Sequence, residues 1–333
     1  MIITQTPLRI SFFGGGTDYP EYYRVSGGET LAASINQYTT VTVHPLTQFV
    51  DYSVRVHYSQ LETVKEISEI EHTTARECMR LLGIPGGIEI YYSDDLPART
   101  GLGSSSAATV GLLHALHTLK GESVSQEQLA VEAVRVEQEM VKDRVGSQDQ
   151  YICALGGFRH LQFHQDGTIE TSLVSVAPER LHALQERLML VYTGKQRNAH
   201  DVLDEQQERT QAGKNDAHLA GMKKLVARGI DVLKGSGDLG EFGFLLHEGW
   251  ELKRKLSNKV TTAQVDEFYE RARAAGASGG KLLGAGGGGF LLLFAEPEMR
   301  ARVKDALSEL NEAPFAFERG GSQLVFHRPH RRL

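Results

Sequence analysis

A glycine- and serine-rich segment directly before an apolar helical pattern constrains the fold of this chain more than any other feature. The string DLPARTGLGSSSAATVGLLHAL covers residues 95–116, and apolar positions recur at helical spacing from Val110 to Leu119, where Gly121 ends the pattern. Glycine lets the backbone approach a bulky anion, and the first N–H groups of a helix lack partners within it and carry the positive end of its dipole. The segment therefore indicates either an anion cradle or an ordinary helix start with small residues packed close.

Three consecutive serines, Ser104, Ser105 and Ser106, add hydroxyl groups at this helix start. We expect the helix to begin near Ser105 and one of the serines to cap it. The other hydroxyls can bind phosphate oxygens or a magnesium ion, which prefers oxygen ligands.

Two common nucleotide-binding motifs do not account for the glycines. The pattern GxxxxGK[ST] is absent, since no Gly-Lys pair is followed by Ser or Thr, and this excludes a P-loop NTPase. The pattern GxGxxG occurs at 235–240 and 284–289. The first copy lies between two helical patterns, and the second precedes the strand-like run FLLLFA where a dinucleotide fold needs a helix. Neither copy supports a dehydrogenase.

The composition favours a small-molecule partner in the cytoplasm. The 333 residues are 41% hydrophobic and carry a net charge of −6, so no global basic field would attract nucleic acid or anionic lipid. The two cysteines, Cys78 and Cys153, have no CxxC-type spacing. We find no leader and no apolar run near the roughly 20 residues that span a bilayer. We therefore expect a cytoplasmic protein without membrane attachment, either a monomer or a homodimer.

Strand and helix patterns alternate along the chain without a strict βαβ rhythm, which predicts an α+β protein of two domains, 1–175 and 176–333. We expect strands at 2–13, 40–46, 53–60, 85–97, 158–164, 168–174, 188–194, 290–295, 315–321 and 322–327. We expect helices at 68–82, 107–119, 125–141, 199–233, 241–255, 262–276 and 298–310.

Three separated segments resemble, in order and spacing, the signature motifs of the GHMP small-molecule kinases. They are PLRISFFGGGTDYPEYY at 7–23, LPARTGLGSSSAATVGLL at 96–113 and KLLGAGGGGFLLLF at 281–294. The resemblance covers nearly the whole chain. It implies an N-terminal domain like domain 2 of ribosomal protein S5, a ferredoxin-like C-terminal domain, and ATP bound between them.

Within this family, the strings GGGTD, GLGSSS, VGSQDQYICALGGF and LVYTGKQRNAHDVLDEQ resemble the bacterial D-glycero-D-manno-heptose 7-phosphate kinase branch. That resemblance implies phosphorylation of an anomeric hydroxyl to the 1,7-bisphosphate, on the route to nucleotide-activated heptose for surface polysaccharide. Galactokinase-like members have Gly-Glu-His where this chain has Gly14–Gly15–Gly16. The missing carboxylate and imidazole argue against galactose as the substrate.

The resemblance also implies roles for particular residues in ATP and magnesium binding. Ser105 and Glu137 match the family's Mg²⁺ ligands, with Glu132 and Glu139 as alternatives to Glu137. The phosphates of ATP are expected on Gly101, Leu102, Gly103, Ser104, Ser105 and Ser106.

Asp149 matches the family aspartate that faces the acceptor hydroxyl, either as general base or as an orienting group. Arg9 matches an arginine of the first motif, and a guanidinium beside Asp149 would favour the ionised carboxylate. Without the resemblance, Asp149 would be interpreted as a turn residue. Asp18 matches a sugar-contacting aspartate, although a simple Thr-Asp cap is the alternative. The full set expected to contact the substrate is Gly15, Gly16, Thr17, Asp18, Lys195, Arg197, Gly286 and Gly287.

A sugar phosphate also needs cations for its distal phosphate. Lys195 and Arg197 follow the strand pattern LMLVYTG, and Arg can bind phosphate with two N–H groups at once. Lys281 and Arg99 are alternatives. No histidine shows the spacing of a zinc site.

The sequence therefore predicts an ATP- and Mg²⁺-dependent sugar-phosphate kinase. One alternative is a kinase of the same fold for another sugar, such as fucose or a uronic acid. The other is a non-catalytic sugar or nucleotide sensor of that fold.

Overall fold

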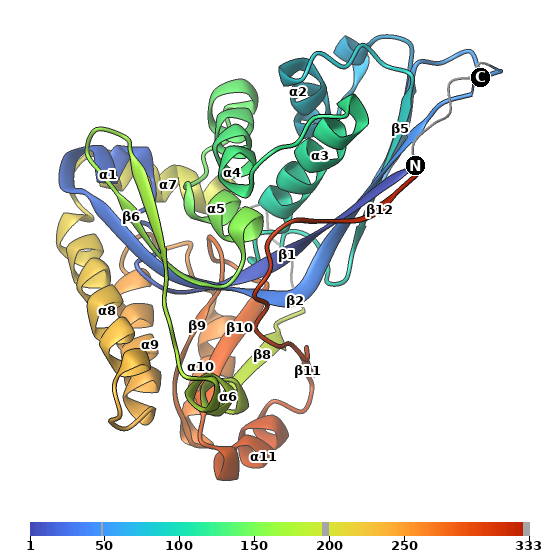
Figure 1. Cartoon of the computed structure of the whole chain (residues 1–333). Coiled ribbons are helices and arrows are strands. Elements are labelled where there is room, and N and C mark those ends of the chain that lie inside the picture. The colour runs from blue at the N-terminus through green and yellow to red at the C-terminus, as the bar shows by residue number, and fades with distance from the viewer. Residues whose placement is uncertain (48, 195–199, 329–333) are drawn as a thin grey trace.

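A large, mostly antiparallel sheet forms the centre of the molecule, and helices cover one of its faces (Figure 1). The computed structural model describes residues 1–47, 49–194 and 200–328. The strands of this sheet are β1 (Ile2–Phe13), β2 (Gly28–Pro45), β3 (Val54–His57), β4 (Leu61–Val64), β5 (Ile88–Asp94), β6 (Phe158–Phe163), β7 (Ile169–Leu173) and β12 (Gln323–His327).

The order of the strands is β12-β1-β2-β5-β3-β4, and the hairpin of β6 and β7 joins through β2. Only the pairing of β3 with β5 is parallel among the described strands. β1 pairs with β2 from Ile2 to Phe13, and the Arg9 backbone lies opposite Ser34 of β2 on one side and donates to the Leu102 oxygen on the other. This position matters because Arg9 belongs to the first motif.

Four α-helices and two shorter helical segments lie on one face of the sheet and share a core with it. Buried apolar side chains such as Val41, Ile90, Leu112, Leu113 and Ile152 exclude water there. The elements on this face are η1 (Ile67–Glu69), α2 (Thr73–Leu81), α3 (Ser104–Lys120), α4 (Gln126–Val134), η2 (Arg135–Val141) and α5 (Gln148–Leu155).

A second sheet of four strands and its helices lie against the other face (Figure 1). Phe12 and Phe13 of β1 pack edge-on against Phe242, and this aromatic cluster joins the two sheets. The antiparallel strands are β8 (Leu188–Tyr192), β9 (Ala277–Leu282), β10 (Phe290–Ala295) and β11 (Asn311–Glu312). The other helices are α1 (Pro20–Ser26), α6 (Pro178–Arg187), α7 (His200–Gln211), α8 (Asp216–Lys234), α9 (Gly240–Lys253), α10 (Ala263–Ala274) and α11 (Pro297–Ala306).

Most predicted elements are confirmed, and the differences have local causes. The helix predicted at 199–233 is two helices, because the chain turns at Gly213 and Asn215. The helix predicted at 125–141 continues from α4 into η2, a π-helix. The sequence did not predict α1, α5, α6, β4, β9, β11 or the first part of β2.

The end of the chain corrects the predicted C-terminal domain, 176–333. Residues 315–321 form no named strand, and only Phe317 makes a bridge, to Ile35 of β2. β12 then pairs with β1. This last segment therefore belongs to the first sheet, because its backbone groups complete the edge beside β1.

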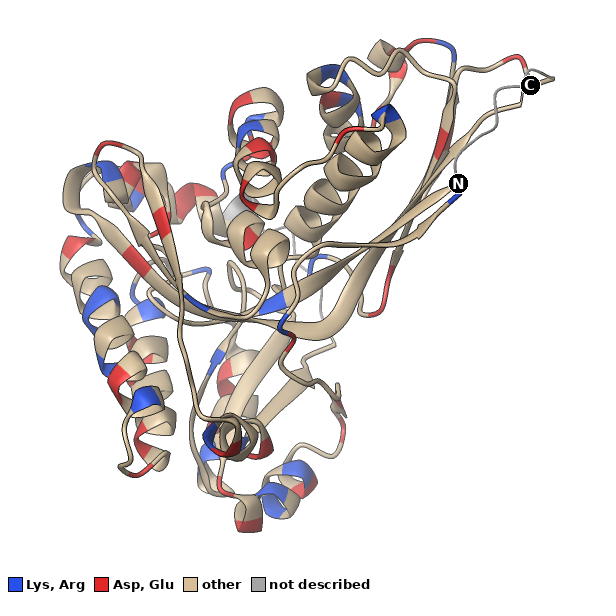
Figure 2. Cartoon of the chain, viewed as in Figure 1, with Lys and Arg blue, Asp and Glu red and all other residues tan. Residues whose placement is uncertain are grey.

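Charged residues of both signs lie along the outer helices α8, α9 and α11 in the view of Figure 2. Among the residues that the structure covers, no helix is both long enough and apolar enough to cross a membrane.

Candidate active site

The start of α3 exposes backbone donors, as expected of an anion cradle. α3 begins at Ser104, and Gly103 takes the N-cap position with φ +77° and no capping side chain. The prediction that a serine caps this helix is therefore wrong. Because no side chain caps the first turn, its N–H groups stay available to a ligand. Ser105 is exposed, whereas Ser104 and Ser106 are buried.

The second and third motifs touch backbone to backbone at this point. A methyl group on Gly101, where φ is +88°, would lie 2.5 Å from the carbonyl oxygen of Leu283. A methyl group on Gly289 would lie 2.3 Å from the oxygen of Thr100, and Phe290 N donates to that oxygen at 3.1 Å. Glycine is required at both positions because any side chain would separate the two loops.

Gly286 and Gly287, which we expected to contact the substrate, pack against Val260. The N–H of Gly287 donates to the Val260 oxygen at 2.9 Å, and a methyl group on Gly286 would lie 2.4 Å from the same oxygen. This packing accounts for both glycines, and their contact with a substrate stays a prediction.

Arg9 and Asp149 form a two-pronged ion pair. Nε of Arg9 donates to Oδ1 of Asp149 at 2.7 Å, and Nη2 donates to Oδ2 at 2.5 Å. The remaining nitrogen, Nη1, donates to the Gly101 oxygen at 2.6 Å. Burial opposes the charge of Arg9, but the carboxylate of Asp149 outweighs it, so the pKa of the guanidinium lies above its ordinary value. Asp149 is in the first turn of α5, which rules out the interpretation as a turn residue.

Asp18 is a buried carboxylate close to this pair. Its Oδ1 accepts from Gly16 N at 2.8 Å and its Oδ2 accepts from Gln148 N at 3.4 Å. Burial, and then the charge of Asp149, raise its pKa to about 6. Tyr19, not Asp18, is the N-cap of α1, so the cap interpretation is wrong. Gly15 and Gly16 line the same turn, with φ +100° at Gly16.

Two predicted ligands also have structural roles. Thr17 is 0% exposed, and its hydroxyl lies 2.8 Å from the carbonyl oxygens of both Gly14 and Glu29 while accepting from Glu29 N at 3.0 Å. The Thr17 hydroxyl is therefore already paired within the protein, and a contact of Thr17 with the sugar stays a prediction. The Leu102 side chain is buried in the core, and its oxygen accepts from Arg9 N at 2.9 Å. The Leu102 side chain therefore faces the core, and a contact of its backbone with ATP stays a prediction.

Glu137 lies beside the start of α3, and its two rivals do not. It is 2% exposed and accepts from Thr109 Oγ1 at 2.6 Å, Ser106 Oγ at 3.0 Å and Gln150 Nε2 at 2.5 Å. Burial raises its pKa to about 7, although the hydrogen bonds from these three donors act to lower it. Glu132 pairs with His117 instead, and the Glu139 side chain is 72% exposed.

Ser105 and Glu137 stay predicted as magnesium ligands, and the structure places a different serine next to Glu137. Ser106, not Ser105, is the serine that bonds to Glu137. Sequence reasoning also missed Thr109 and Gln150, although Ser106 and Thr109 share a helix face by their spacing of three. The oxygen Oε1 of Gln150 is buried without a partner.

This donor set fits a magnesium ion shared with phosphates. It offers one carboxylate, two hydroxyls and an unpartnered amide oxygen, which are hard oxygen ligands. Within the described ranges, there is no cluster of three or more His, Cys, Asp or Glu side chains that could hold a metal ion. A magnesium ion here would therefore also need hydroxyl, amide or phosphate oxygens.

The predicted cations for a distal phosphate divide into three cases. Lys195 and Arg197 lie outside the described residues. Lys281 is buried, and its ammonium donates to the Phe12 oxygen at 2.9 Å. Arg99 is exposed just before the phosphate loop, with φ +61°.

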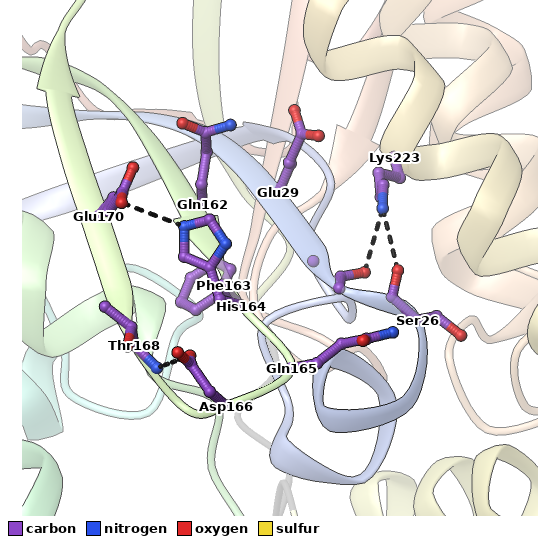
Figure 3. A pocket seen from close by; sticks show the side chains of 12 residues that line it. Ser26, Glu29, Gln162, Phe163, His164, Gln165, Asp166, Thr168, Glu170 and Lys223 are labelled. Atoms are coloured by element: carbon purple, nitrogen blue, oxygen red, sulfur yellow. Dashed lines mark hydrogen bonds and ion pairs between the residues drawn. The ribbon is translucent and has the colours of Figure 1, made fainter.

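A separate groove of about 750 Å³ lies between the β6–β7 hairpin, the start of β2 and α8 (Figure 3). Lys223 donates to the carbonyl oxygens of Ser26 and Gly27 at its edge, and Glu170 faces His164. None of the side chains predicted to bind ATP or to act in catalysis lines it. The candidate site is therefore the meeting point of the three motifs and not this groove.

Comparison with known families agrees with this geometry. Residues 63–157 match the family described as GHMP kinases N terminal domain, and residues 222–313 match GHMP kinases C terminal. Together these matches span more than half of the chain. The chain belongs to the GHMP kinase family, an ATP-dependent class of phosphotransferases, and the two-domain α+β fold predicted from the sequence is confirmed.

Similar individual proteins include kinases of sugars and sugar phosphates as well as mevalonate kinases. A Campylobacter jejuni protein named D-glycero-alpha-D-manno-heptose 7-phosphate kinase is 26% identical, over 92% of this chain and 93% of that protein. A Bacteroides fragilis L-fucokinase/L-fucose-1-P guanylyltransferase is also 26% identical, over 92% of this chain but 36% of the relative. The crystal structure of a D-glycero-D-manno-heptose 1-phosphate kinase from Bacteroides thetaiotaomicron has a TM-score of 0.81 at 24% identity, covering 99% of this chain and 100% of the other.

Proposed function

We propose that this protein transfers the terminal phosphoryl group of ATP to the anomeric hydroxyl of D-glycero-D-manno-heptose 7-phosphate, giving the 1,7-bisphosphate. The observation that carries the proposal is the position of Arg9, which bonds both to Asp149 and to the Gly101 oxygen of the phosphate loop. An acceptor hydroxyl at Asp149 would thus be held beside the phosphates. The heptose substrate is supported by the similar Campylobacter jejuni protein, which aligns over nearly its full length.

The chain's own groups divide the work of phosphoryl transfer between positioning and charge. The N–H groups at the start of α3 bind the phosphates, and Glu137 with Ser106 and Thr109 would hold Mg²⁺. The ion supplies neutralisation of the negative charge that develops on the transferred group. Asp149 accepts the hydrogen bond of the acceptor hydroxyl and either orients it or takes its proton, while Arg9 fixes the carboxylate.

Asp18 and the glycines before it would face the sugar. Gly15 and Gly16 leave room because they have no side chains, Gly15 offers a backbone N–H, and Asp18 offers a buried carboxylate for hydrogen bonds with sugar hydroxyls. Lys195 and Arg197 are the proposed partners of the distal phosphate. An Arg197→Ala variant would then lose activity on heptose 7-phosphate and keep its activity on any free sugar that it accepts.

A second candidate function is phosphorylation of a free sugar such as fucose, which the similar bifunctional fucokinase favours. A coupled assay of ADP release over heptose 7-phosphate, free heptose, fucose, galactose and uronic acids separates the two. We expect turnover with heptose 7-phosphate and none with galactose. Turnover with fucose alone would establish the second candidate. No turnover with any acceptor, together with ATP binding, would point to a sensor.

A further inference from the structure

Two buried lysines lie behind the candidate site and have no role in the function proposed above. Lys253, the last residue of α9, and Lys281 of β9 are 7% and 4% exposed. Lys253 Nζ donates to the carbonyl oxygens of Leu282 and Gly284, at 2.8 and 2.5 Å. Lysines are rarely buried to this extent unless their charge has a partner.

Lys253 holds the glycine loop at the residue where that loop touches the phosphate loop. A methyl group added to Gly284 would lie 2.4 Å from Cα of Gly101, so the two backbones are in direct contact there. Gly101 in turn receives the hydrogen bond from Arg9. A chain of contacts thus runs from α9 through the third and second motifs to the residue that holds Asp149.

The ammonium of Lys253 has no carboxylate beside it in the described part of the chain. Burial first, and then the positive charges of Lys281 on β9 and Arg9 on β1, lower its pKa well below the ordinary value. Lys281 is influenced by the same Arg9 and, in the opposite sense, by Asp18. A buried cation without an anion is costly, and an anion that binds nearby offsets that cost.

We propose that Lys253 is a positioning residue for the nucleotide. Its side-chain nitrogen fixes the carbonyl groups of Leu282 and Gly284, and the positive charge that it carries in the complex strengthens binding of a triphosphate at the start of α3. This inference rests on the proposed function only in requiring that ATP binds there.

The test compares Lys253→Met with Lys255→Met, which changes an exposed lysine two positions further on. Calorimetric titration without an acceptor measures affinity for ATP and for adenosine. We expect Lys253→Met to weaken ATP binding at least tenfold and to change adenosine binding less than twofold. Lys255→Met should leave both unchanged. A merely structural role would weaken both ligands alike, and that result would overturn the inference.

Lys253→Gln provides a second variant, because an amide keeps a hydrogen-bond donor but has no charge. Its ATP affinity should fall between those of the wild type and Lys253→Met, and an affinity equal to the wild type would remove the role of the charge. If neither variant folds, the wild type is titrated with ATP at pH 8 in buffers of different ionisation enthalpy, which measures the protons taken up on binding. Proton uptake on ATP binding is expected, and its absence would contradict the inference. A wild type that binds no ATP would instead overturn the proposed function.

Discussion

Nη2 of Arg9 and Oδ2 of Asp149 lie 2.5 Å apart, although 140 positions separate the two residues in the sequence. The same guanidinium reaches the Gly101 oxygen, so one side chain joins the first motif, the phosphate loop and α5. Because Arg9 lies on β1, which pairs with β2 from Ile2 to Phe13, the sheet fixes the backbone of the residue at this junction.

Replacing Asp149 by Asn should remove catalysis and retain nucleotide binding. The amide has the shape of the carboxylate but accepts a proton far less readily, and general base catalysis contributes about 10²–10⁴-fold to a rate. We expect kcat to fall by a factor in that range while the KM for ATP changes less than threefold. Steady-state kinetics with heptose 7-phosphate measure both. Full activity of the variant would remove Asp149 from the reaction.

Replacing Arg9 by Lys should damage both the rate and nucleotide binding. A lysine cannot reproduce the two parallel bonds to Asp149 together with the bond to Gly101, and a hydrogen bond to a charged group contributes roughly 1.5–3 kcal/mol. We expect kcat to fall about 10- to 100-fold and the KM for ATP to rise several-fold. An effect on kcat alone would show that the bond to Gly101 does not help to shape the phosphate loop.

The elements and motifs of the site were predictable because they depend on local sequence. The glycines and the helix start of α3 follow from residue type, and Glu137 and Asp149 follow from the family resemblance. Their meeting with Arg9 and Thr109 depends on how strands and helices far apart in sequence pack. The hydrophobic periodicity of a single segment does not show which distant residues will contact it in the folded chain.

Replacing Glu137 by Gln should change how stability depends on pH. The pKa of Glu137 is about 7 in the folded protein against an ordinary 4.5, so between these pH values the folded protein retains a proton that the unfolded chain has released. The free energy of unfolding of the wild type therefore falls as the pH rises from 4.5 to 7. We expect Glu137→Gln to gain about 3 kcal/mol relative to the wild type between pH 5 and pH 8. Urea unfolding of the ligand-free protein at both pH values measures it.

The matched control for this prediction is Glu139→Gln, two positions away and exposed. It should follow the wild type at both pH values. Glu137→Gln should also weaken Mg²⁺-dependent ATP binding, since its amide is a poorer magnesium ligand. If the free energy of unfolding depended on pH equally in the two variants, Glu137 would not hold a proton in the folded protein at neutral pH.

Replacing Gly101 by Ala should lower the stability of the protein more than the same replacement at Gly121, which lies at the other end of α3. Both have positive φ, +88° and +74°, which costs alanine about 1–2 kcal/mol in either place. A methyl group at Gly121 meets nothing within 4 Å, whereas one at Gly101 would meet Leu283 O at 2.5 Å. We expect Gly101→Ala to lose additional stability and most ATP binding, measured by thermal unfolding with and without ATP. Equal effects would show that the two loops can separate freely.

Other features of the site left no signal in the sequence. Lys253 stands in the polar run ELKRK, where a lysine is ordinarily solvated, and only the packing of α9 against β9 buries it. Thr17 belongs to a family motif, but its hydroxyl is hydrogen-bonded to the backbone of Glu29 on β2. The π-helix that carries Glu137 has an ordinary helical sequence, and its wider turn is a tertiary effect.

The most direct test of the account is a crystal structure of the complex with Mg²⁺ and a non-hydrolysable ATP analogue. We predict that the β- and γ-phosphate oxygens lie about 3 Å from backbone nitrogens in the first turn of α3. The metal should contact Glu137, and Asp149 should face the γ-phosphate. A triphosphate bound elsewhere, with side chains filling the start of α3, would contradict the account.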